Sequence, residues 1–82
     1  MNIHTDTFKT ASELAALKMN GILIDLCGEI ALIRRGVKSY GDQNLSYVIT
    51  HYSTKTNSFY WSAYDLSLDS AVQMFNEEIK GE

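Results

Sequence analysis

Cys27, His51 and Asp25 have the side chains that nucleophilic catalysis requires. A thiolate acts as a nucleophile when a base lies beside it and a carboxylate orients that base. No family signature surrounds these residues, and a cysteine without one is more often a small apolar filler. We therefore expect Cys27 to fill a turn, Asp25 to point outward from an edge strand, and His51 to lie at a hairpin end. The prediction is that the chain is not an enzyme and has no catalytic residue.

Metal binding is not indicated by the spacing of the candidate ligands. The two histidines, His4 and His51, lack a second ligand at a spacing such as H-x-x-E-H or C-x-x-C. A zinc ion would have no framework of ligands, so we expect no metal site and no cofactor.

A cluster of cations gives an alternative site, for nucleic acid. Arg34, Arg35 and Lys38 lie close to Tyr40 in a segment that contains glycines, and such a loop can contact phosphate groups. The whole chain has a net charge of −3, however, whereas nucleic-acid binding favours a basic field. Cations at the end of a strand more commonly keep a sheet edge solvated. Nucleic acid therefore remains the alternative partner, with these four residues as its binding site.

A predicted β-hairpin over residues 45–64 positions most of the aromatic side chains. Two runs rich in Tyr, Val, Ile, Thr, Phe and Trp flank a polar turn at residues 53–57. With a loop of three or five residues, odd positions pair with odd positions. The odd positions then form a buried face: Tyr47, Ile49, Phe59, Trp61 and Ala63. The even positions form a wet face: Ser46, Val48, Thr50, Tyr52, Ser58, Tyr60, Ser62 and Tyr64.

The N-terminal part of the chain predicts an arm followed by a helix. Residues 1–9 show no apolar period, and we expect them to form a flexible arm before a single domain over residues 10–82. Thr10 and Glu13 have the spacing of a capping box. The Asn-Gly pair that follows Met19 tolerates positive φ and ends the helix there.

Residues 22–26 and 30–35 predict an antiparallel strand pair with Gly28 in the turn between them. A single bent strand with a bulge at Gly28 fits these residues nearly as well. A helix over residues 29–35 is the third interpretation, because periodicity alone does not distinguish short buried elements. Residues 36–44 have the composition of a loop.

The last helix, over residues 68–80, has the clearest pattern. Its apolar residues fall on one helical face: Leu68, Ala71, Val72, Phe75 and Ile79. The fold class is therefore α+β, with a helix, a three- or four-stranded antiparallel sheet and a second helix. We expect both helices to cover one face of the sheet and leave the other face open. Trp61 should then be buried near Phe75.

The wet face of the hairpin is the most informative surface. Its tyrosines either stabilise the sheet as cross-strand pairs or form a docking surface, because tyrosine is enriched at binding hot spots. The acidic residues of the last segment would form the rim. The predicted partner-binding residues are Tyr52, Tyr60, Tyr64, Asp69, Glu77 and Glu78.

Length and composition set the class of protein. At 82 residues the core is small, and such a domain commonly gains stability by forming a homo-oligomer or by docking on a partner. A single cysteine excludes an intrachain disulfide, and no apolar run approaches the length of a membrane span. No signal-peptide pattern precedes the first helix. We expect a cytoplasmic protein that binds another protein and no membrane.

Residues 60–78, YWSAYDLSLDSAVQMFNEE, carry one resemblance. An aromatic strand that runs into D-L-x-L-x-x-A-x-x-x-F is similar to the ending of small α+β proteins encoded by phages and mobile elements, among them anti-CRISPR proteins. The resemblance implies stoichiometric binding to a host nuclease or defence complex in the host cytoplasm. It carries over no site residue.

Overall fold

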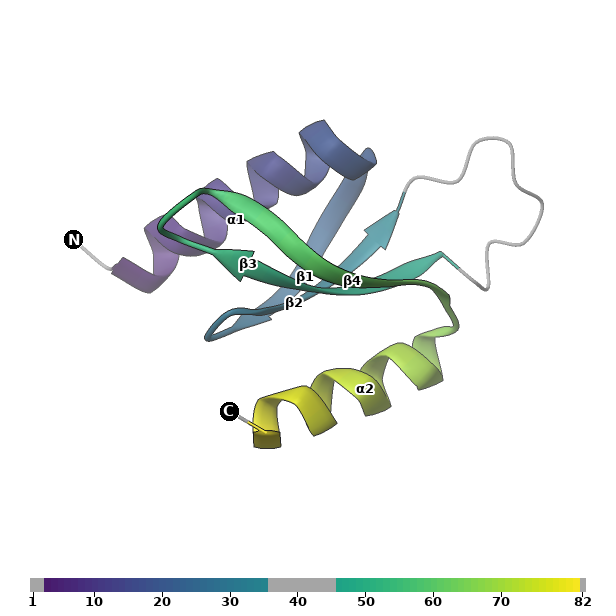
Figure 1. Ribbon diagram of the computed structural model, residues 1–82. Helices are drawn as coiled ribbons and strands as arrows, with labels where there is room; N and C mark the ends of the chain where they lie inside the picture. Colours follow the sequence, from purple (N-terminus) through teal and green to yellow (C-terminus); the bar gives the residue numbers. More distant parts are fainter. Residues whose placement is uncertain (1–2, 36–45, 82) are drawn as a thin grey trace.

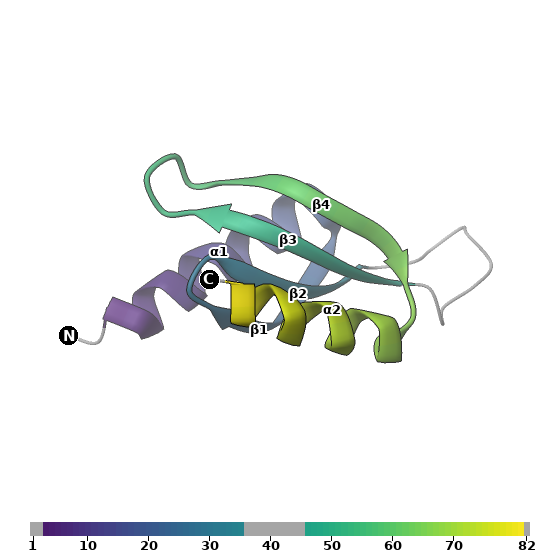
Figure 2. The ribbon, with the colours of Figure 1, turned by 60° about the horizontal axis from the view of Figure 1, so that its bottom comes forward.

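A four-stranded antiparallel sheet in the order β1-β2-β3-β4 lies between two helices (Figures 1 and 2). The computed structural model describes residues 3–35 and 46–81. Its elements are α1 (Ile3–Met19), β1 (Gly21–Cys27), β2 (Ile30–Arg35), β3 (Tyr47–Ser53), β4 (Ser58–Leu66) and α2 (Leu68–Gly81). The predicted α+β class and the order helix, sheet, helix are confirmed. Neither α1 nor α2, as far as these residues are described, is long and apolar enough to cross a membrane.

The two helices pack on opposite faces of the sheet, so the expectation that they share one face was wrong. The cause lies in β2, where residues 30–33 are apolar at every position and all are buried. Because successive side chains of a strand point to opposite faces, a continuous apolar run requires cover on both. No face of the central strands is left open.

Each helix forms its own core cluster with the sheet. The α1 cluster consists of Ala11, Leu14, Ala15, Leu23, Ala31, Ile33, Val48 and Tyr52, with Met19, Leu26 and Phe59 packed against it. The α2 cluster consists of Ile30, Leu32, Ile49, Ala71 and Phe75, with Tyr47, Leu66, Met74 and Ile79 packed against it. α1 packs mainly on β1, and α2 packs on β2 and β3. The edge strand β4 therefore receives little cover from α2.

α1 begins at Ile3 rather than at Thr10, which corrects the predicted helix start. Residues 3–9 contain neither Gly nor Pro, so nothing in them interrupts a helix once it has nucleated. The predicted end is confirmed: Asn20 has a φ of 51°, and its N–H donates to the Ala16 carbonyl at 3.1 Å. The capping-box spacing at Thr10 was therefore a false start signal inside a longer helix.

The predicted pair of strands before the hairpin is confirmed as β1 and β2. Gly28 has a φ of 58°, the left-handed conformation that a tight turn requires and that glycine adopts without strain. Asp25 lies exposed on the edge strand β1, as expected. Cys27 is exposed as well, so the expectation that it fills a turn was wrong. The predicted loop at residues 36–44 lies outside the described residues.

The β3–β4 hairpin departs from the predicted register beside its turn, but farther along Ile49 pairs with Ala63, which is the predicted odd-with-odd pairing. Its turn comprises residues 54–57, so Ser53 pairs with Ser58 and Tyr52 with Phe59, and even positions pair with odd ones. Farther along, Thr50 pairs with Ser62, which means that one residue of β3 opposes two residues of β4 between these pairs. This arrangement is a β-bulge.

Two burial predictions are wrong because of where the helices pack. Tyr52 is only 2% exposed, because the face that was expected to be wet carries α1. Trp61 is 51% exposed, because it lies on the edge strand and α2 packs on β2 and β3 instead. The predicted contact of Trp61 with Phe75 is therefore replaced by exposure to solvent on the same side of the sheet as α2.

Candidate protein-binding surface

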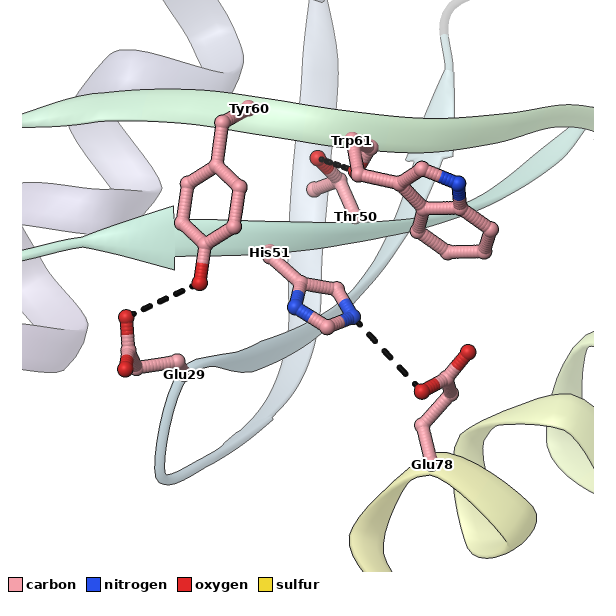
Figure 3. A network of polar contacts seen from close by, with 6 residues as sticks. All are labelled: Glu29, Thr50, His51, Tyr60, Trp61 and Glu78. Atoms are coloured by element: carbon pink, nitrogen blue, oxygen red, sulfur yellow. Dashed lines mark hydrogen bonds and ion pairs between the residues drawn. The ribbon is translucent and has the colours of Figure 1, made fainter. Parts of the chain in front are cut away.

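Tyr60 and Trp61 are adjacent, half-exposed aromatic side chains on β4, at 47% and 51% exposure. They occupy the bulge opposite His51, and each ring makes a T-shaped contact with its imidazole, with ring centroids 5.3 Å apart in each case. Figure 3 shows the imidazole lying between the two rings. In a regular strand, neighbouring side chains point to opposite faces. The bulge is what brings both large rings to one surface.

Two carboxylates complete this surface, and they come from two other elements. The Tyr60 hydroxyl donates to Glu29 Oε2 at 3.0 Å, in the turn between β1 and β2. His51 Nε2 lies 3.7 Å from Glu78 Oε2 on α2, a pair that is ionic only when the imidazole is protonated. Nε2 is buried and has no hydrogen-bond partner among the described residues. We call Glu29, His51, Tyr60, Trp61 and Glu78 the aromatic–acid surface.

A buried hydroxyl holds the bulge in place from the opposite face. Thr50 is fully buried, and its Oγ1 donates to the Trp61 carbonyl at 2.9 Å. Its Oγ1 also lies 2.7 Å from Ser62 Oγ. Since the single Thr50 proton goes to the carbonyl, the Ser62 hydroxyl is the donor in the second bond. The Trp61 carbonyl is thus satisfied, and a side-chain hydrogen bond ties the backbone beneath the aromatic pair to β3.

Tyr64 lies on the other side of β4 from Tyr60. The Arg35 guanidinium sits over its ring, 5.3 Å from the centroid, and pairs with Asp65 Oδ1 at 3.8 Å. Tyr64 also lines a groove of about 350 Å³ between α1 and β4, whose other lining residues are Leu14, Lys18, Met19, Ser58, Phe59 and Ser62. Tyr60 and Tyr64 therefore cannot serve one flat contact.

The predicted partner-binding residues are thus dispersed. Tyr52 lies in the α1 cluster, where its hydroxyl donates to Asn57 Oδ1 at 2.5 Å and burial raises its pKa. Asp69 and Glu77 are exposed on α2, and Glu78 is half-buried against His51. Only Tyr60 and Glu78 of the predicted set belong to the aromatic–acid surface.

The sequence prediction missed Glu29, His51 and Trp61 as members of this surface. Trp61 was assigned to the core because it holds an odd position of the predicted hairpin, on the face that was expected to be buried. No local signal in the sequence marks the bulge that brings Tyr60 and Trp61 together, because Tyr and Trp are ordinary strand formers.

The alternative cationic site is divided by the sheet. Arg34 and Arg35 are consecutive in β2, so their side chains leave opposite faces, and Arg35 is already paired with Asp65. Lys38 and Tyr40, also assigned to this site, lie outside the described residues. The described part of this cluster therefore forms no joint phosphate contact.

The candidate nucleophile and its expected partners are not assembled. His51 pairs with Glu78, and the Asp25 carboxylate accepts a hydrogen bond from the Leu26 N–H at 2.8 Å. Within residues 3–35 and 46–81, no three His, Cys, Asp or Glu side chains are grouped closely enough to hold a metal ion.

Comparison with protein-family models, with curated proteins and with solved structures gave no significant match to this chain.

Proposed function

We propose that this chain is a non-catalytic protein-binding module whose contact surface is centred on Tyr60 and Trp61. The observation that supports the proposal most is the bulge, which places two half-exposed aromatic side chains side by side on one strand. Trp and Tyr are the residues most enriched at binding hot spots, because they bring a large area with little rotamer entropy. Trp61 replaces Tyr52 as an anchor, since Tyr52 is buried.

The surroundings of the two rings suit a contact surface. Thr50 holds the backbone of the bulge from the opposite face, and His51 makes a T-shaped contact with each ring. A rigid anchor loses little conformational freedom on binding, which favours affinity. Glu29 and Glu78 supply a polar border.

The partner class in this proposal comes from the resemblance of residues 60–78 to small phage and mobile-element proteins. The chain would act as a stoichiometric inhibitor of a host defence complex in the cytoplasm. Its small size is consistent with that role, because binding to one surface of a target requires no catalytic machinery.

The test compares three single substitutions. Trp61→Ala and Tyr60→Ala should each weaken the complex by about 2 kcal/mol or more, roughly thirtyfold in Kd, because hot-spot aromatics dominate interface energy. Leu17→Ala is the matched control: Leu17 is 78% exposed on α1, outside this surface. A partner captured with the wild-type chain is purified, and its affinity for each variant is measured by calorimetry. Equal affinity of the wild type and Trp61→Ala would refute the proposal.

A further inference from the structure

The chain contains an internal example of how β4 holds a cation. Arg35 places its guanidinium 5.3 Å from the centroid of the Tyr64 ring, while the Asp65 carboxylate lies 3.8 Å from the same guanidinium. An aromatic face attracts a cation through its quadrupole, and a neighbouring carboxylate adds a charged hydrogen-bond acceptor. On this side of β4, an aromatic ring and a carboxylate therefore form a cation site, and Arg35 of the same chain occupies it.

The other side of β4 has the same pairing of an aromatic ring with a carboxylate, and its ring binds cations more strongly. Trp61 replaces Tyr64, and indole is the best of the three aromatic rings for binding cations. Glu78 and Trp61 both contact His51, and Glu29 accepts a hydrogen bond from the Tyr60 hydroxyl. Among the described residues, the ionic partner of Glu78 is the His51 imidazole, which is neutral unless protonated. Half of the Trp61 surface stays open to solvent.

We infer that the aromatic–acid surface receives an arginine or lysine side chain of the partner, so that the partner's contact segment is basic. This inference rests on the proposed function and names the chemistry of its partner. The cation lies against the exposed indole of Trp61 and forms an ion pair with the Glu78 carboxylate, as Arg35 does with Tyr64 and Asp65. The chain's net charge of −3 and the acids of α2 favour the approach of such a segment.

Trp61 provides a direct readout, because it is the only tryptophan of the chain. Its fluorescence is followed while the full chain is titrated with a short Gly/Ser peptide that carries one central arginine. The same peptide with lysine tests the second cation, and the peptide with citrulline, which is neutral and nearly isosteric with arginine, is the matched control. We expect saturable binding of the arginine and lysine peptides and at least tenfold weaker binding of the citrulline peptide.

Two protein variants locate the contact. Glu78→Gln should weaken binding of the arginine peptide roughly threefold to tenfold, since it removes the charge beside Trp61. Glu77→Gln changes the net charge equally but alters a residue whose carboxylate accepts from Gln73 Nε2 at 3.3 Å on α2, and it should bind as the wild type does. Circular dichroism confirms that both variants are folded.

Several outcomes would overturn the inference. Equal binding of the arginine and citrulline peptides, or no binding of the arginine peptide at millimolar concentration, would show that the surface does not select a cation. Equal losses in Glu77→Gln and Glu78→Gln would reveal unspecific attraction. In each case Trp61 could still anchor an uncharged partner segment. The opposite outcome is also distinguishable. If the arginine peptide binds through Glu78 but Trp61→Ala keeps full affinity for the captured partner, the proposed function is wrong and the cation site remains.

Discussion

His51 and Tyr52 are neighbours on β3, and their polar atoms differ in hydrogen bonding. The Tyr52 side chain points into the α1 cluster, and its hydroxyl is satisfied by Asn57 at the end of the hairpin turn. The His51 side chain points to the other face, where its Nε2 is buried without a hydrogen-bond partner among the described residues. A satisfied buried group stabilises a fold, whereas an unsatisfied one is costly and often belongs to a functional surface.

Tyr52 predicts a loss of stability at alkaline pH. Burial raises the pKa of its hydroxyl above the ordinary value of 10.0, so the folded chain keeps the proton to higher pH than the unfolded chain does. Between the two pKa values the folded state binds more protons, and the free energy of unfolding therefore falls as pH rises. This stability is fully present below the ordinary pKa. Denaturant titrations from about pH 8 to about pH 11 should show the decline.

The control for this prediction is a pair of phenylalanine variants. Tyr52→Phe should remove most of the alkaline decline, although it also removes the hydrogen bond to Asn57. Tyr64→Phe, at an exposed tyrosine, should keep it. If the free energy of unfolding depended on pH in the same way in both variants, the decline would arise elsewhere.

At the scale of elements, the junction of α1 and β1 depends on a glycine. A Cβ atom at Gly21 would lie 2.8 Å from Ile33 Cγ2 and 3.0 Å from the Arg34 carbonyl oxygen. Gly21→Ala should therefore lower the free energy of unfolding by about 1–3 kcal/mol through overpacking.

Gly81, the last residue of α2, is the matched control, because a Cβ there meets nothing within 4 Å. Gly81→Ala should be neutral, or should stabilise the helix by up to about 1 kcal/mol. Thermal and urea unfolding of the two variants measure both effects. A tolerated Gly21→Ala would mean that β1 and β2 can separate slightly at no cost.

The elements that were predicted from sequence are those with local signals. Gly28 predicts the turn between β1 and β2, and the apolar stripe at residues 68–79 predicts α2. The bulge at residues 60–61 was not predicted, because Tyr and Trp are ordinary strand formers and no Gly marks the site. Since the bulge decides on which face of the sheet Tyr60 lies, the candidate surface could be predicted only in part. The continuous apolar run in β2 is a sequence signal for helices on both faces of the sheet.

The whole molecule is a sheet whose two inner strands belong to both core clusters. β2 and β3 contribute side chains to each cluster, whereas β1 and β4 lie at the edges. We therefore expect the amides of residues 30–33 and 48–50 to exchange hydrogen only through global unfolding. The amides of β4 beyond the bulge should exchange faster, by local opening. Native-state hydrogen exchange followed by NMR tests the order, and equal protection of β3 and β4 would contradict it.

The irregular pairing of the outer strands also affects how copies of this chain meet in solution. β1 is interrupted between Leu23 and Asp25, and β4 is interrupted at two places along its pairing with β3. An open sheet edge with a regular row of amide and carbonyl groups is a template on which further chains stack into fibrils. Both edges here are kinked, and the kinks interrupt that template. The bulge that brings Tyr60 and Trp61 to one surface thus also limits aggregation through β4.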